Sequence, residues 1–168
     1  MGSRPTLVLC VVVLVLSAVT APAESQPSEE GLRQVQGHAF FAPGFRPNDG
    51  TGLFSAGGGV DWLLGKWFGV GIDSHFFGFW ECSSCGALVV TGNASVIRRR
   101  VTLTETWEPF ARVGLGGAVS DEGGLSAVAF GGGTNYWWRE KLALRFEFRG
   151  EYFFEGDTYA FFRAGLTF

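Results

Sequence analysis

The chain has 168 residues and a formal net charge of −3. A charge this small, without a basic stripe, argues against a nucleic-acid-binding protein. The chain also holds 17 Phe, 6 Trp and 26 Gly, a composition that is hard to place in an ordinary soluble core, because glycine weakens strands and offers no side chain to pack.

The first 23 residues are typical of a cleavable secretory signal peptide. Arg4 precedes an uncharged, mostly apolar run over 6–19, and Ala21 and Ala23 occupy the small-residue positions of a cleavage site. The run is shorter than a membrane helix requires and lacks a basic flank on its far side, which argues against an anchor. We therefore expect residues 1–23 to be removed when the protein is exported across the inner membrane.

Residues 24–36 are polar and predict a flexible periplasmic lead-in to a single domain over 37–168. In that domain, apolar residues recur at every second position, which is the period of a β-strand. We expect strands over 37–45, 52–63, 67–80, 91–102, 107–119, 127–138, 142–153 and 159–168. Turn-forming or charged segments separate them, and no sustained helical period appears.

An even number of strands joined by hairpins favours an up-and-down antiparallel barrel. Closing the sheet removes the exposed edges that an open sheet would leave in lipid. Eight strands make a narrow barrel whose interior is filled by side chains. The sequence therefore predicts an all-β, eight-stranded transmembrane barrel.

The alternation separates large apolar residues from a face that mixes glycine and charge. In the segment 142–153, for example, Phe146 and Phe148 alternate with Glu147 and Arg149. A soluble lipocalin-like barrel would place the apolar face inside. Glycine suits a crowded interior, and a soluble exterior would carry more Lys and Glu than this chain has. We expect the apolar face to meet lipid.

Tryptophans gather near three alternate turns, which an up-and-down barrel places at the same rim, together with the terminal aromatic residue. Such an arrangement predicts an aromatic girdle, which we assign to the periplasmic rim. Its expected members are Trp62, Trp67, Trp107, Trp137, Trp138 and Phe168.

Four segments resemble a known family: Pro109-Phe110-Ala111-Arg112-Val113-Gly114-Leu115-Gly116, Phe130-Gly131-Gly132-Gly133-Thr134-Asn135-Tyr136, Leu142-Ala143-Leu144-Arg145-Phe146-Glu147-Phe148-Arg149 and Arg163-Ala164-Gly165-Leu166-Thr167-Phe168. They are similar to the small bacterial outer-membrane β-barrels of the type seen in the membrane domain of the major outer-membrane protein A. The resemblance implies that the terminal aromatic strand is a recognition signal for the barrel-assembly machinery.

Charged residues of both signs are expected to face the lumen. They are Asp61, Asp73, Arg112, Arg145, Glu147, Arg149, Glu151 and Arg163. Charges removed from bulk water must be paired or hydrated, and neighbouring strands bring opposite charges within reach. We favour a paired network that plugs the lumen over a narrow pore, because eight strands leave little open bore.

A lipid-modifying enzyme is a further alternative, since small barrels can carry a serine, a histidine and an acid on one face. The run Asp73-Ser74-His75 contains these residue types, but alternation turns Ser74 to the opposite face. The His-x-Ser signature of lipid A deacylase barrels is absent at His38 and His75. We therefore expect no catalytic residues and no cofactor.

Cys82 and Cys85 lie in the segment 82–90, which we interpret as a surface loop. Two nearby cysteines in an exported protein favour a disulfide that stiffens the loop. A zinc site would need more ligands, and no thioredoxin-like context supports a redox-active pair. We expect no metal site.

Together these features predict an integral outer-membrane protein of a Gram-negative-type bacterium, with a structural or interaction role. The narrow pore and the lipid-modifying enzyme remain as alternatives. The expected partners are outer-membrane lipid and, during biogenesis, the barrel-assembly machinery, with the protein itself a monomer. The sequence leaves the facing of Arg98, Arg99 and Arg100 open.

Overall fold

The computed structural model describes residues 35–65, 67–98, 105–120, 123–154 and 156–168. The expected signal peptide, and the lead-in up to residue 34, lie outside these ranges. The strands are β1 (Val35–Phe45), β2 (Gly52–Leu64), β3 (Phe68–Phe79), β4 (Cys82–Ile97), β5 (Trp107–Ser120), β6 (Gly123–Arg139), β7 (Leu142–Phe153) and β8 (Thr158–Thr167). In those ranges there is no helix that is long and apolar enough to cross a membrane.

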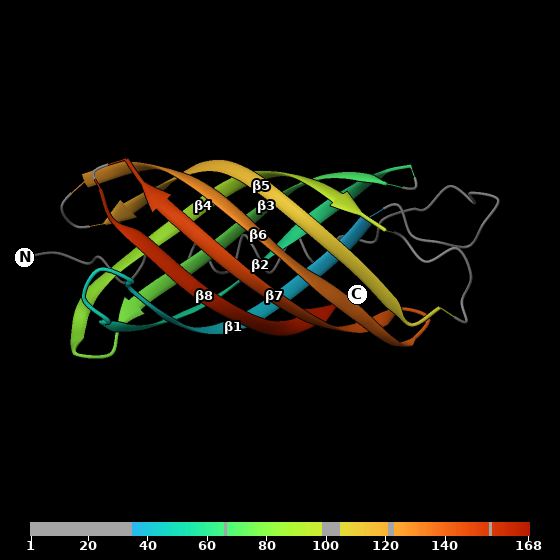
Figure 1. Cartoon of the computed structure of the whole chain (residues 1–168), viewed down its shortest axis with the longest axis horizontal. Helices are drawn as coiled ribbons and strands as arrows, with labels where there is room; N and C mark the ends of the chain where they lie inside the picture. The colour runs from blue at the N-terminus through green and yellow to red at the C-terminus, as the bar shows by residue number, and fades with distance from the viewer. Residues whose placement is uncertain (1–34, 66, 99–104, 121–122, 155) are drawn as a thin grey trace, which may run out of the picture. The chain divides into compact units, whose positions relative to one another are not determined.

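Each strand pairs antiparallel with the next one along the chain, and β1 pairs with β8. The predicted closed eight-stranded antiparallel barrel is therefore confirmed. Figure 1 shows the strands crossing the barrel obliquely, with β1 in blue beside β8 in red. We call the end that holds Val35 and Phe168 the terminal rim, and the end where β1 joins β2 the loop rim.

Four expected strand limits were wrong by two residues or more; two of them are the end of β4, at Ile97 and not at 102, and the start of β6, at Gly123 and not at 127. The segment 82–90, predicted as a loop, forms the first part of β4, which pairs with β3 from Phe68↔Val96 to Phe79↔Cys82. Its Ser and Gly residues are typical of turns, and the apolar run 87–90 shows no alternation. Backbone pairing with β3 makes it a strand nevertheless. At the other end, β1 already begins at Val35, inside the predicted lead-in 24–36.

The two faces of the barrel differ as the alternation predicts. In β7, Glu147 and Arg149 are buried while Phe146 and Phe148 are exposed on the outside. In β3, Asp73 is buried and its neighbour Ile72 is exposed. The outer surface is therefore a band of large apolar side chains, and the charged residues line the interior.

The interior changes character along the barrel axis. Towards the loop rim it holds the ring cluster, which we define as Phe77, Phe79, Phe153, Tyr159 and Phe161. Within this cluster the ring centroids of Phe77 and Tyr159 lie 5.1 Å apart, and those of Phe153 and Tyr159 lie 5.4 Å apart. The charged residues occupy the middle of the barrel.

Interior glycines leave room for these charged groups. A Cβ atom on Gly71 would collide with Oδ1 of Asp61 on the neighbouring strand, and one on Gly59 would lie 2.5 Å from Oδ1 of Asp73. Real Cβ atoms do not approach oxygen this closely. Glycine at these positions of β2 and β3 therefore leaves room for the two carboxylates.

Candidate functional site

The middle of the barrel holds a cluster of buried charges from β2, β3, β5, β7 and β8, joined by histidines from β1 and β3. The structure brings together all eight of the predicted lumen charges. We define the lumen network as Asp61, Asp73, Arg112, Arg145, Glu147, Arg149, Glu151 and Arg163, with His38 and His75. Each of these residues is at most 5% exposed.

Asp73 on β3 is the centre of the lumen network. Its Oδ2 atom accepts hydrogen bonds from Nη1 of Arg149 at 2.7 Å, from Nη1 of Arg112 at 2.9 Å and from Nη1 of Arg163 at 3.4 Å. Its Oδ1 atom lies 2.9 Å from Nε2 of His38. One carboxylate thus contacts side chains from four other strands.

Asp61 on β2 forms a second centre. Nη2 of Arg112 donates to both of its carboxylate oxygens, at 3.0 and 2.8 Å, and Nη1 of Arg145 donates at 3.4 Å. Nδ1 of His38 lies 3.6 Å from Oδ2 of Asp61. His38 therefore has a carboxylate beside each ring nitrogen and links the two aspartates.

The glutamates of β7 extend the lumen network towards the loop rim. Arg145 donates to Oε2 of Glu147 through Nε at 3.3 Å and Nη2 at 3.2 Å. Glu151 Oε1 accepts from Nε of Arg149 at 2.7 Å and from Nη2 of Arg163 at 3.4 Å. Alternating arginine and glutamate along one face of β7 thus neutralise each other.

His75 closes the lumen network on the side of β8. Nη2 of Arg163 lies 3.2 Å from Nδ1 of His75, and Nε2 of His75 lies 3.3 Å from Oε2 of Glu151. Because an arginine only donates, Nδ1 is the accepting nitrogen, which leaves the ring proton on Nε2, towards Glu151. His75 therefore lies between the cation Arg163 and the anion Glu151.

Aromatic rings cover the guanidinium groups. Arg163 lies over the ring of Phe40 with its Cζ 4.0 Å from the centroid, and Arg145 lies over Phe110 at 4.2 Å. Cation–π contacts of this kind strengthen when they are removed from water. At the loop rim, Arg46 lies over the rings of Phe79 at 5.3 Å and Tyr159 at 5.8 Å.

Sequence reasoning missed a second polar cluster near the terminal rim. Oε1 of Glu108 accepts from Nε2 of Gln36 at 3.2 Å and from Nδ2 of Asn135 at 3.0 Å, and Thr167 donates to Asn135 at 3.1 Å. Glu108 shares its face of β5 with Arg112, so alternation could have found it. The predicted lead-in includes Gln36, and uncharged Asn and Thr are as common in turns as in a lumen.

The three residues Asp73, Ser74 and His75 do not form a catalytic group. Asp73 and His75 are buried in the lumen, whereas Ser74 belongs to the outward face of β3. The ring nitrogens of His75 contact Arg163 and Glu151 instead. In addition, the described ranges contain no group of three or more His, Cys, Asp or Glu residues that could hold a metal ion.

Most of the expected girdle residues lie on the outside at the terminal rim. Trp62, Trp67, Trp107 and Trp138 are exposed. Trp137 was predicted wrongly, because it is only 4% exposed. Consecutive strand residues face opposite sides, so Trp137 and Trp138 cannot both face outward.

Phe168 lies at the seam between the first and last strands. Its backbone exchanges two hydrogen bonds of 2.9 Å with Gly37, and a Cβ atom on Gly37 would lie 2.6 Å from the Phe168 ring. The terminal ring therefore packs directly on the backbone of β1.

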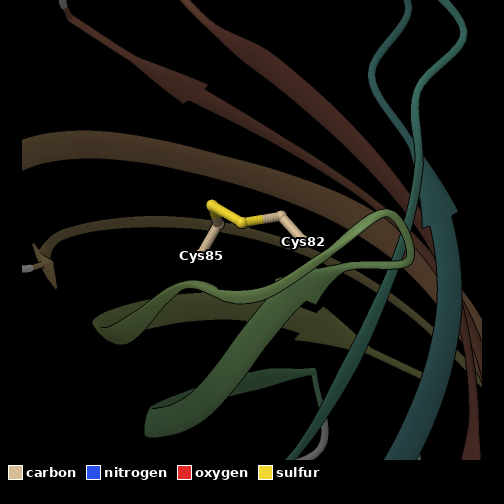
Figure 2. The surroundings of a disulfide bond; sticks show 2 residues. All are labelled: Cys82 and Cys85. Atoms are coloured by element: carbon tan, nitrogen blue, oxygen red, sulfur yellow. A yellow bond between two sulfur atoms is a disulfide. The ribbon is translucent and has the colours of Figure 1, made fainter.

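Cys82 and Cys85 are joined by a disulfide, which Figure 2 shows at the start of β4. The pairing of β3 with β4 shifts here, since Gly78 pairs with Gly86 while the adjacent Phe79 pairs with Cys82. The disulfide thus bridges a bulge at the loop rim, not the loop that the sequence predicted.

Comparison with solved structures places this architecture among known barrels. The N-terminal β-barrel domain of OprF from Pseudomonas aeruginosa matches with a TM-score of 0.58 and 17% identity, over 80% of this chain and 96% of that domain. Neisserial surface protein A matches with a TM-score of 0.57 and 18% identity, over 79% and 94%.

A de novo designed transmembrane β-barrel matches with a TM-score of 0.54 and 12% identity, over 85% of this chain and 98% of the design. No protein-family model and no curated protein sequence matches the chain. The chain therefore has the fold of the small outer-membrane β-barrels that its four segments between Pro109 and Phe168 resemble.

Proposed function

We propose that this protein is an integral outer-membrane β-barrel with a structural or interaction role and with a lumen that is plugged by paired charges and aromatic rings. The band of exposed apolar side chains around the barrel supports the membrane location, since closed barrels are the β-structures that can span lipid. The similarity in fold to a designed transmembrane barrel and to a neisserial surface protein supports it further.

One observation supports the proposal that the lumen is plugged: the charged side chains inside the barrel contact one another instead of lining a channel. Arg149 contacts Asp73 and Glu151 at 2.7 Å each, and Arg112 contacts both Asp61 and Asp73. Towards the loop rim the ring cluster follows directly. An ion would have to separate these pairs and displace the rings, because an eight-stranded barrel has no spare bore.

Short connections at the loop rim favour a structural role over an enzyme. By the strand limits, β1 and β2 are joined by residues 46–51, β3 and β4 by 80–81, β5 and β6 by 121–122, and β7 and β8 by 154–157. These segments offer little surface for positioning a lipid substrate. The polar side chains of the lumen are buried, where a lipid headgroup would not reach them.

Outer-membrane fractionation, followed by planar-bilayer recording of the full chain, tests the proposal. We expect the protein in the outer-membrane fraction, with heat-modifiable migration on a denaturing gel and no steady conductance. The double variant Phe77→Ala/Arg163→Ala, first checked for heat-modifiable migration, should conduct and shows that the recording can detect an opened lumen. Recovery in the soluble periplasm would refute the membrane location, and reproducible wild-type channels would refute the plug.

A further inference from the structure

The two rims of the barrel carry opposite charge. At the loop rim, the acidic residues Asp49, Glu81 and Asp157 outnumber Arg46. The backbone N–H of Thr51 donates to Oδ1 of Asp49 at 2.9 Å and lowers the pKa of that carboxyl, which keeps it charged. At the terminal rim, the basic residues outnumber the acidic ones: Arg98, Arg139 and Lys141 against Glu105 and Glu140.

Arg98 directly follows β4, whereas Arg139 and Lys141 lie where β6 joins β7, so the basic residues of the terminal rim do not come from a single hairpin. The inference below rests on the described residues Arg98, Arg139 and Lys141.

These three basic side chains are exposed next to the lipid-facing surface. Arg98 lies two residues after the outward Val96, and its backbone N–H donates to the carbonyl of Pro109 at 2.9 Å, which fixes it beside β5. Arg139 directly follows the exposed Trp138. Tryptophan at a barrel rim lies at the depth of the headgroups, so the basic groups reach that depth too.

The three basic side chains are also available to bind a ligand from outside the barrel. Among the described residues, no ion pair and no side-chain hydrogen bond involves Arg98, Arg139 or Lys141. Guanidinium and ammonium groups bind phosphate oxygens, arginine often with two parallel hydrogen bonds. Exposed charges of one sign around the rim thus fit a ring of anionic headgroups.

We propose that the terminal rim binds anionic phospholipids, through the phosphates of the leaflet that surrounds it. This inference rests on the proposed function, because it requires the barrel to lie in a membrane. The acidic loop rim makes the preference one-sided, since its carboxylates repel the same headgroups. The protein therefore recruits a shell of anionic lipid around one end only.

Lipid selectivity of the full-length protein tests this inference. The protein is inserted into phosphatidylcholine vesicles that contain spin-labelled phosphatidylglycerol or spin-labelled phosphatidylcholine, and the motionally restricted lipid is measured. We expect wild type to prefer phosphatidylglycerol by about fivefold, the factor that one basic residue near a membrane surface supplies. The variant Arg98→Gln/Arg139→Gln/Lys141→Gln should lose most of this preference, and 0.5 M salt should reduce it, as screening requires.

The matched control changes as many charges at the opposite rim, with Asp49→Asn/Glu81→Gln/Asp157→Asn, and should keep or increase the preference. Heat-modifiable migration in the same vesicles checks insertion separately. A protein that does not insert contradicts the proposed function. An inserted wild type without lipid preference, or a terminal-rim variant that keeps the wild-type preference, overturns this inference alone.

Discussion

Asp73 is the residue on which the lumen depends most. A single carboxylate accepts hydrogen bonds from Arg112, Arg149 and Arg163, and His38 lies beside its other oxygen. Burial of each charge costs free energy, which only close and complete pairing offsets. Removing this one anion would leave several cations without their nearest partner.

We therefore expect Asp73→Asn to lower the free energy of unfolding by about 3 to 5 kcal/mol, the range found when one partner of a buried ion pair is removed. Urea unfolding in vesicles, followed by tryptophan fluorescence, measures the change. Asp49→Asn removes an exposed carboxylate and should leave the free energy of unfolding close to that of wild type. Equal effects of the two variants would mean that the Asp73 contacts contribute little.

Glycine positions inside the barrel can be tested in the same way. Gly71→Ala places a methyl group against Asp61, and we expect it to cost about 1 to 3 kcal/mol through overpacking. Gly92→Ala on β4 is the matched control, because its Cβ atom would meet only the carbonyl oxygen of Leu115, at 3.9 Å. If Gly71→Ala were as stable as Gly92→Ala in thermal unfolding, the interior would have more room than these contacts indicate.

At the level of the strands, β4 marks the limit of sequence reasoning. Alternation predicted the facing of β3, β5 and β7, because each carries charges opposite large apolar residues. No such contrast appears in the first part of β4, which contains Ser83, Ser84 and the apolar run 87–90. Its strand structure depends on backbone pairing with β3, which the sequence pattern does not show. The partners inside the lumen network were equally beyond the sequence, since they depend on the register of all the strands and not on one strand's pattern.

The disulfide acts within one hairpin, the one formed by β3 and β4. The variant Cys82→Ser/Cys85→Ser should lower the free energy of unfolding by at most about 2 kcal/mol, since the closed loop is short. Reduction of wild type should have the same effect. Thiol titration before and after reduction, together with urea unfolding, measures both. Free thiols other than that of Cys10 in the untreated protein, or loss of the barrel in the serine variant, would contradict this view.

For the molecule as a whole, the outer surface distinguishes a membrane barrel from a soluble one. Val113 lies near the middle of β5 and is 55% exposed. In lipid, Val113→Arg should cost about 2 to 4 kcal/mol, as charges near the bilayer midplane do. Folding yield and urea unfolding in phospholipid vesicles give the value.

Glu81→Arg, at the loop rim, is the control and should fold as wild type does. A soluble barrel would tolerate arginine at both positions, because each would then face water. The comparison therefore tests whether the barrel lies in lipid or in water. The sequence predicts lipid from its composition and from the large apolar residues on one face of the strands.

The lumen network also bears on how the strands find their register. Along the inner face of β7 the charge reverses at every second residue, from Arg145 through Glu147 and Arg149 to Glu151. A slip by one residue would turn these charges to lipid. A slip by two would keep them inside but place a glutamate where Arg149 meets Asp73, a residue 76 positions earlier in the chain. Contacts between like charges would thus destabilise a misregistered barrel, so the charged interior favours the correct register during assembly.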